Sequence, residues 1–317
     1  MSYGQSSELL KNIGKETKSE KNKSESMLYD DILNGSKILK KRAVEKIGRL
    51  YASESGHCAR KGTLSALDSD DTLMKPTFLY YTEIGKTVEN ALIQSLITSN
   101  VLLFPNKDNI TEQFNIPDVG LNLGGKLDGI IYKNGKISLL EIKTAGQKMP
   151  NDPAKEKPQH LAQARIYSAL LGTDINLLYF ARNVSSDMHG ESLKIREFYY
   201  KFDRGAVYDT IFSACLSSYS VTNGYIPPIP ETINFQNKAD MCSYCNFFSY
   251  CWSDNKKEIN LKTPNEQENK IMREFAHNKT GEILNPKNIK IRHENFIDDI
   301  IKVGNKDLVN SLTFMRK

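Results

Sequence analysis

The chain contains no apolar run of the roughly 18–20 residues that a membrane-spanning helix requires. Its first residues, Met1 to Ser7, also lack the basic start and the apolar stretch of a secretory signal. We therefore expect a protein of a reducing, intracellular compartment without a membrane partner. That compartment is the cytoplasm, or the host cytoplasm if the protein is viral.

Neither sign of charge dominates the sequence. There are 43 Lys and Arg residues against 38 Asp and Glu, and the formal net charge is +5. This small excess permits a nucleic-acid partner but does not require one. With 317 residues, of which 39% are hydrophobic, the chain is long enough to bury one sizeable core.

Cysteine is also scarce, with 5 residues in the chain, and disulfides are not expected in a reducing compartment. Cys242, Cys245 and Cys251 are nevertheless clustered, whereas Cys58 and Cys215 lie far away in the sequence. Clustered thiols inside a cell usually hold a metal. The spacing therefore predicts a three-thiolate knuckle that lacks one ligand.

The two ends of the chain differ from its centre. Residues 1–26 are polar and predict a flexible arm. Residues 36–50 predict a basic helix, which is either a solvated face or a surface that contacts phosphates. Residues 256–317 carry 13 Lys and Arg against 9 Asp and Glu, and 294–312 predict an amphipathic helix there.

Between these ends, the hydrophobic periodicity alternates between helix and strand. It predicts an α/β fold with a mixed sheet flanked by helices. Asn134-Gly135 is a strong signal for a tight hairpin, and Pro158 and Gly172 are suited to the start and end of a helix. The expected order is a helix at 83–98, strands at 110–117, 121–132 and 136–144, a helix at 158–171, strands at 175–182 and 194–202, and a helix at 204–222.

The strand at 136–144 carries two charged residues on one face, Glu141 and Lys143. Charged side chains on an apolar strand are costly to bury unless something compensates them. A divalent cation would compensate Glu141. The alternative is an edge strand whose face is wet.

Asp128 in the preceding strand favours the cation. The hairpin through Asn134-Gly135 places Asp128 and Glu141 at about equal distances from the turn, so both carboxylates are expected at one end of the sheet. Paired carboxylates with water suit Mg²⁺, which prefers hard oxygen ligands. A neighbouring lysine suits phosphodiester hydrolysis, because it can stabilise developing negative charge.

Asp128, twelve intervening residues and then Glu141-Ile142-Lys143 resemble the D-(x)n-E-x-K signature of the PD-(D/E)XK nucleases. Gln163 and Tyr167 resemble the Q-x-x-x-Y helix of the RecB-like branch, although by themselves they also fit an ordinary amphipathic helix. Gly85 to Glu89 resembles the G-x-x-x-H element of that branch. The sequence departs from the pattern at Leu127, where the superfamily name has proline, and at Glu89, where most RecB-like members have histidine.

The resemblance implies a restriction-endonuclease-like fold over about residues 51–255 and a Mg²⁺- or Mn²⁺-dependent deoxyribonuclease. It implies exonuclease action on DNA ends or single strands, with endonuclease action as the alternative. Recombination, replication or CRISPR proteins are the partners that it suggests. The implied metal ligands are Glu89, Asp128, Glu141 and the Ile142 carbonyl. Lys143 would act on the attacking water, with Gln163 and Tyr167 in support.

One cysteine before the nuclease motifs and three after them, spaced C-x2-C-x5-C, resemble the iron–sulfur exonucleases of the CRISPR-associated and AddB types. This resemblance implies a structural 4Fe–4S cluster on Cys58, Cys242, Cys245 and Cys251. Zinc takes the same four ligands and is the alternative. Cys215 is expected to be a buried apolar side chain. His57 and His160 are expected to make local packing or polar contacts.

Two other functions remain open from the sequence. One is a non-catalytic DNA-binding subunit with an iron–sulfur cluster, although the complete set of Asp128, Glu141 and Lys143 argues against it. The other is a zinc-stabilised interaction module, which leaves the carboxylates unexplained. The expected organisation is an arm and basic helix at 1–50, a nuclease domain at 51–255 and a basic tail at 256–317.

Overall fold

The computed structural model describes residues 48–56, 58–67, 76–108, 110, 112–145, 156–181, 195–229, 242, 245, 247–252, 261–306 and 308–309. The arm at 1–26, His57 and most of the basic helix at 36–50 lie outside the described residues. Leu50, the last residue of that predicted helix, belongs to strand β1 (Leu50–Tyr51) instead. None of the described helices is both long enough and apolar enough to span a bilayer.

A five-stranded mixed sheet forms the centre of the molecule, in the order β2-β6-β7-β8-β9. The β7–β8 pair is parallel and the other three pairs are antiparallel. The predicted α/β class with a mixed sheet is thus confirmed. The strands are β2 (Leu102–Phe104), β6 (Gly129–Lys133), β7 (Lys136–Ala145), β8 (Asp174–Ala181) and β9 (Ile195–Tyr200).

The hairpin between β6 and β7 forms as the sequence predicts. Asn134 has a φ of 53° and Gly135 a φ of 75°, and Lys133 pairs with Lys136 across the turn. Positive φ at both central residues is what a two-residue hairpin turn requires, and Asn-Gly adopts it at little cost. The turn sets the register that brings Asp128 beside the second half of β7.

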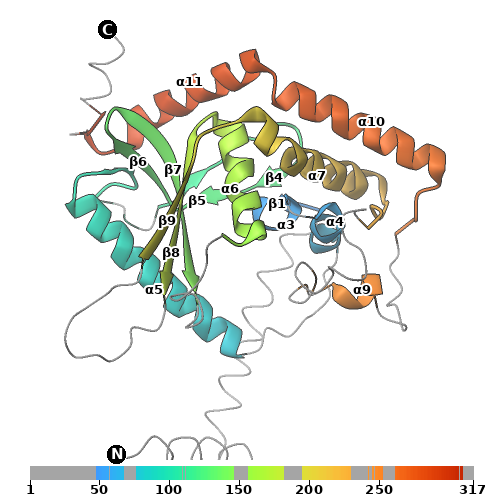
Figure 1. Ribbon diagram of the computed structural model, residues 1–317, viewed down its shortest axis with the longest axis horizontal. Helices are drawn as coiled ribbons and strands as arrows, with labels where there is room; N and C mark the ends of the chain where they lie inside the picture. The colour runs from blue at the N-terminus through green and yellow to red at the C-terminus, as the bar shows by residue number, and fades with distance from the viewer. Residues whose placement is uncertain are drawn as a thin grey trace, which may run out of the picture.

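Helix α6 (Pro158–Leu171) connects the parallel strands β7 and β8. Pro158 occupies the first turn, and Gly172 ends the helix in the left-handed conformation with a φ of 62°. Both residues act as the sequence predicts. The crossover places α6 on one face of the sheet, while α5 (Pro76–Thr98) lies on the other (Figure 1).

Alternation along β7 divides its side chains between two cores. Leu139 belongs to the large core that includes α6, and Leu140 and Ile142 pack in a smaller cluster with Leu92 and Ile93 of α5. Glu141 and Lys143 therefore face the α6 side of the sheet. Because β7 is the middle strand, the edge-strand alternative is wrong.

The predicted strand at 121–132 is interrupted. It consists of β4 (Leu123–Gly124), β5 (Lys126–Leu127) and β6, and the chain bends at Asp128. Strands β4 and β5 pair with β1 and with β3 (Phe114–Asn115) rather than with the large sheet. The interruption releases Asp128 from the strand ladder, so its carboxylate can turn toward β7. Strand β2 was not predicted, because it is short and its residues do not alternate between buried and exposed.

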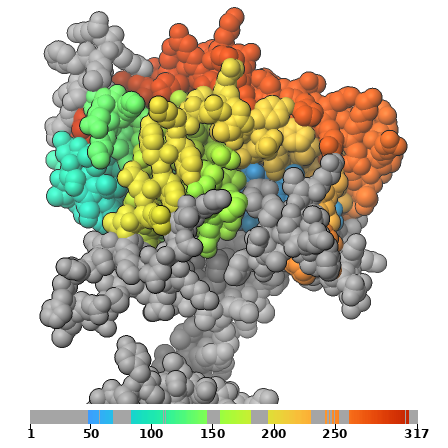
Figure 2. Space-filling view, viewed as in Figure 1, coloured from blue at the N-terminus to red at the C-terminus, as the bar shows by residue number. Residues whose placement is uncertain are grey.

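The remaining helices cover the α6 side of the molecule. Helix α10 packs on α7, and α11 packs on α6. Together α10 and α11 form one continuous band along an edge of the molecule (Figure 2). The helix predicted at 294–312 begins earlier and ends at Val303, and its Phe296 and Ile300 are buried in the main core. The bounds are α3 (Ala52–Ser55), α4 (Ala59–Leu67), α7 (Arg204–Asn223), α9 (Phe248–Trp252), α10 (Glu266–Ile283) and α11 (Pro286–Val303).

Candidate active site

The carboxylate of Asp128 is bonded directly to strand β7. Its Oδ2 accepts a hydrogen bond from the Ile142 backbone N–H at 2.7 Å, and its Oδ1 accepts one from Gln113 Nε2 at 3.4 Å. Gly129, the next residue, pairs with Leu140 in the β6–β7 ladder. Asp128 and Glu141 thus lie side by side, as expected from the hairpin. Nothing in the sequence marked Gln113.

Glu141 is buried in the middle of the sheet, with only 1% of its surface exposed. Its Oε1 lies 2.5 Å from Lys143 Nζ. Its Oε2 is also buried and has no hydrogen-bond partner among the described residues. An unpaired oxygen of a buried carboxylate costs free energy of folding, so this position calls for a cation or a donor that the described residues do not supply.

A chain of hydrogen bonds holds Lys143 from the side of α6. Its Nζ donates to Gln163 Oε1 at 3.0 Å, and Gln163 Nε2 donates to the Tyr167 hydroxyl at 3.0 Å. Tyr167 is 2% exposed and packs so closely against Gly125 that a Cβ there would lie 2.6 Å from Tyr167 Cε1. The two α6 residues therefore share one face, as their spacing predicts, and they position the lysine.

Glu89 reaches the same region from α5, on the other side of β7. Burial raises the pKa of Glu89 to about 7, and the negative charge of Asp128 adds to this effect. Lys143 and Lys86 act in the opposite direction. Glu89 therefore lies within electrostatic reach of the central residues, although it is only half-buried.

Negative charge exceeds positive charge in this cluster. Burial and then the charge of Asp128 raise the pKa of Glu141 to about 8, and burial raises the pKa of Asp128. Burial by itself lowers the pKa of Lys143. The negative charges of Glu141, Asp128 and Glu89 together have the larger effect, so the pKa of the lysine is raised. Three carboxylates thus act electrostatically on one ammonium group in a largely desolvated place, where a divalent cation would restore the balance.

The carboxylate oxygens of Asp128 and Glu141 are ligands of the type that Mg²⁺ and Mn²⁺ prefer. In the described part of the chain, no group of three or more His, Cys, Asp or Glu residues is arranged so that it could hold a metal by itself. Magnesium, however, is usually held by one or two carboxylates, with water and substrate phosphates completing its shell. Asp128 and Glu141 supply such a pair, and the unpaired Glu141 oxygen is the position that a cation would satisfy. The Ile142 carbonyl stays a predicted ligand.

The four cysteines predicted to bind a cluster lie near one another. Burial raises the pKa of the Cys58 thiol, and the charges of Cys251 and Cys242 raise it further. The thiol of Cys245 is likewise shifted upward by burial, Cys58 and Cys251. Backbone bonds from Cys245 N to Cys242 O and from Phe248 N to Cys245 O, 2.9 and 3.1 Å long, shape the knuckle. Among the described residues, these thiols do not form a ready-made set of three or more metal ligands.

Two further observations concern the thiols. Arg60, two residues after Cys58, donates from Nε to Cys251 Sγ at 3.2 Å and from a second nitrogen to the Pro227 carbonyl at 2.9 Å. These two hydrogen bonds join segments that are far apart in the sequence, and no sequence pattern predicted them. Cys215 is fully buried in α7, where Thr280 contacts its sulfur at 3.6 Å, and burial raises its pKa to about 11. Its predicted role as a buried apolar side chain is confirmed.

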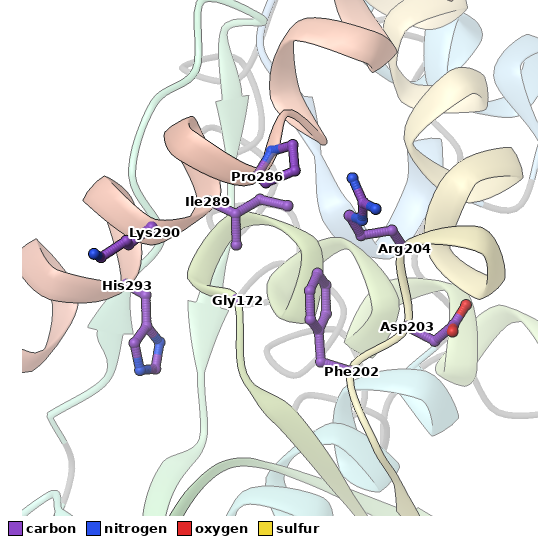
Figure 3. Close-up of a pocket in the computed structure, with 8 residues that line it drawn as sticks. All are labelled: Gly172, Phe202, Asp203, Arg204, Pro286, Ile289, Lys290 and His293. Carbon is purple, nitrogen blue, oxygen red and sulfur yellow. The ribbon is translucent and has the colours of Figure 1, made fainter.

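One cavity lies away from all of these residues. It has a volume of about 520 Å³ and is formed where α6 ends and where α7 and α11 begin (Figure 3). None of the predicted site residues lines it. The lining residues are Gly172, Phe202, Asp203, Arg204, Pro286, Ile289, Lys290 and His293.

No family model matches the chain. No curated protein matches it either. Among solved structures, an alkaline exonuclease (LHK-Exo) from Laribacter hongkongensis is similar over 56% of this chain and 90% of its own, at 14% identity and a TM-score of 0.39. The same exonuclease in complex with dAMP matches at 13% identity, with the same coverage and TM-score. A protein described as SSO0001 is similar over 72% of this chain and 98% of its own, at 17% identity and a TM-score of 0.39. Similarity at this level carries no inference about function.

Proposed function

We propose that the chain is a metal-dependent DNA nuclease with a restriction-endonuclease-like core, which hydrolyses phosphodiester bonds. One observation carries this proposal. The buried Glu141 lies between Asp128 and Lys143 and leaves one oxygen without a partner. A purely structural ion pair would satisfy both carboxylate oxygens or leave them in water, whereas a catalytic site keeps a place for a cation and a substrate.

In this proposal each residue has a separate task. Asp128 and Glu141 would hold Mg²⁺ or Mn²⁺, with Glu89 and the Ile142 carbonyl as further ligands. When bound, the metal polarises the phosphate and lowers the pKa of a water molecule. Lys143 stabilises the negative charge that develops on the phosphate and orients the attacking water.

Two further residues act through the lysine. Gln163 orients Lys143 through its Oε1, and Tyr167 fixes Gln163 in turn. The contacts with Glu141 and Gln163 hold the Lys143 ammonium group in place, as electrostatic stabilisation of a transition state requires.

DNA is the proposed substrate and exonuclease action on DNA ends the proposed mode. The sequence resemblance to the RecB-like branch supports both. The enzyme class itself rests on the carboxylate and lysine geometry.

A second element of the proposal is a four-cysteine centre that joins the two ends of the domain. The mutual proximity of Cys58, Cys242, Cys245 and Cys251 supports it, and Arg60 offers a positive charge to Cys251. A 4Fe–4S cluster is the proposed occupant, with zinc as the alternative. Its role would be structural, because the thiols belong to a group separate from the carboxylates.

The experiment is a cleavage assay with the full chain on DNA labelled at one end, with Mg²⁺, with Mn²⁺ and with a chelator. We expect cleavage that needs the metal and that falls by about 10³-fold in Lys143→Ala, as for loss of a transition-state charge stabiliser. Lys302→Ala is the control, because Lys302 pairs with the exposed Asp299 on the surface of α11. Equal cleavage by Lys143→Ala and wild type would overturn the assignment.

A further inference from the structure

His160 makes a specific contact with a tyrosine of the central sheet. Tyr179 lies on β8 directly opposite Lys143 of β7, and it is 2% exposed. Its hydroxyl oxygen is 2.9 Å from His160 Nδ1 and accepts a hydrogen bond from the Lys157 backbone N–H at 3.0 Å. The two rings lie 5.6 Å apart between centroids. The histidine is thus anchored beside the strand that carries the candidate active site.

This geometry determines which nitrogen of His160 carries the proton. The Tyr179 oxygen already accepts from Lys157, and Tyr179 keeps its own proton because burial raises its pKa to about 12. If Nδ1 also donated, the buried hydroxyl proton would have no acceptor among the described residues, at a cost of about 1–3 kcal/mol. Tyr179 therefore donates to Nδ1, and the proton of a neutral ring is on Nε2.

The ring is neutral in these surroundings. Burial, followed by the positive charges of Lys143 and Lys157, lowers the pKa of His160 to about 3. The influence of Lys143 also shows that the imidazole lies within electrostatic reach of that ammonium group. Nε2–H is then a hydrogen-bond donor without a charge, and no described residue accepts from it.

The position of His160 on α6 continues the line of residues that supports the site. His160, Gln163 and Tyr167 follow one another at helical spacing, so they share one face of the helix. Gln163 contacts Lys143, and His160 lies one turn nearer the helix N-terminus, where backbone N–H groups and the helix dipole favour anions. An acceptor that carries negative charge is the natural partner for a donor in this place.

We propose that His160 donates its Nε2–H to a non-bridging oxygen of the DNA phosphodiester that Lys143 faces, and that Tyr179 is the positioning residue that selects this tautomer. The proposal rests on the proposed nuclease function. A neutral donor adds a contact to the phosphate without repelling Lys143, and it keeps the same protonation state across neutral pH. The sequence by itself predicts only a local packing or polar contact for His160.

The first test measures the tautomer and needs no cleavage. In protein labelled with ¹⁵N and ¹³C at histidine, the ring signals of His160 are identified by their absence in His160→Gln. We expect a neutral ring protonated at Nε2 at pH 7, and a mixture of tautomers in Tyr179→Phe. A ring protonated at Nδ1, or at both nitrogens, would overturn the proposal.

The second test measures contact with the phosphate. A short single-stranded oligodeoxynucleotide is added in Ca²⁺, and the Nε2–H signal of His160 is followed. We expect this signal to move while that of His277 stays in place. His277 is a matched control, because its Nδ1 also lies 2.8 Å from a tyrosine hydroxyl, that of Tyr208, between α7 and α10. Saturation with oligonucleotide that leaves the His160 signal unmoved would refute the contact.

The third test separates function from structure by kinetics. We expect His160→Ala to lower kcat by about 10²-fold with little change in KM, as for loss of one transition-state donor. His160→Gln should keep most of kcat, because its amide nitrogen can occupy the place of Nε2. His277→Ala and Tyr208→Phe should match wild type. Equal loss in the Ala and Gln variants, at unchanged melting temperature, would contradict a donor role.

The two proposals fail in different ways. If wild-type protein binds DNA and does not cleave it with any metal, the nuclease proposal fails, and the tautomer and the signal shift still test His160. If wild-type protein cleaves DNA and the His160 signals do not respond to it, only the proposal for His160 fails.

Discussion

Asp128 accepts the backbone N–H of Ile142 at 2.7 Å, so a carboxylate on one side of the hairpin is bonded to the residue that follows Glu141 on the other. The bond replaces a contact that a regular strand would make, because the chain bends at Asp128. It holds two acidic groups side by side although they repel each other, and the charge of Asp128 raises the pKa of Glu141.

Asp128→Asn should abolish metal-dependent cleavage and leave the fold intact. The amide oxygen can still accept from Ile142, but it lacks the charge that a metal ligand needs. We expect a loss of about 10³-fold in rate or more, on the scale of one transition-state stabiliser. The control is Asp118→Asn, because Asp118 also accepts a backbone N–H, that of Gly120 at 3.0 Å, but on the surface. Near-normal cleavage by Asp128→Asn would show that the site is elsewhere.

Glu141→Gln should stabilise the protein when divalent cations are absent. The substitution replaces a buried acid, whose pKa burial and Asp128 raise to about 8, with an amide that needs no proton to be neutral, and Lys143 keeps the negative charge of Asp128 as a partner. We expect the free energy of unfolding to rise by about 1–2 kcal/mol. Mg²⁺ should raise the melting temperature of wild type more than that of the variant, because the metal binds only the folded site.

Thermal melting with and without Mg²⁺ measures this effect. Glu282→Gln is the control, since Glu282 pairs with Lys279 at the surface and is 59% exposed. Surface pairs contribute little, so its melting temperature should stay close to that of wild type. If Glu141→Gln is less stable than wild type in the absence of metal, the surrounding residues already compensate the charge of the Glu141 carboxylate.

Gly125→Ala should reduce activity through Tyr167. The added Cβ would lie 2.6 Å from Tyr167 Cε1 and 2.9 Å from Ile116 Cδ1, so the ring must move and Gln163 must lose its hydrogen bond. We expect a loss of about 1–3 kcal/mol in stability, with a decrease in kcat. Gly281→Ala in α10 is the opposite case. Nothing lies within 4 Å of its added Cβ, and it should gain about 0.5–1 kcal/mol. If kcat is unchanged in Gly125→Ala, Tyr167 does not contribute to the positioning of Lys143.

Substitution of any one of the four clustered cysteines should release the bound centre. Protein purified without oxygen should contain about four irons per chain. Cys58→Ser should lose them and unfold at lower temperature, because Cys58 closes a very long loop onto the knuckle. Cys215→Ala should keep the iron, since its thiol is buried in α7. Iron and zinc analysis with thermal melting measures both effects. One tightly bound zinc without iron would contradict the cluster and keep a four-cysteine site.

Local sequence patterns determined much of the architecture. Asn134-Gly135 specifies its turn through backbone conformation, and Pro158 and Gly172 mark the ends of α6 for the same reason. The spacing of Asp128, Glu141 and Lys143 around that turn brings these three residues together at one end of the sheet. These signals succeed because their cause lies within a few residues of the chain.

Only the tertiary structure decided which residues these side chains contact. Gln113 contacts Asp128, His160 contacts Tyr179, and Arg60 contacts Cys251, and each pair comes from segments that are distant in sequence or on different elements. Burial decided the charge balance as well, because Glu141 on a wet edge strand would be an ordinary acid. A sequence specifies which groups are available, but the cost of desolvating them and the donors that meet them depend on how the sheet and helices pack.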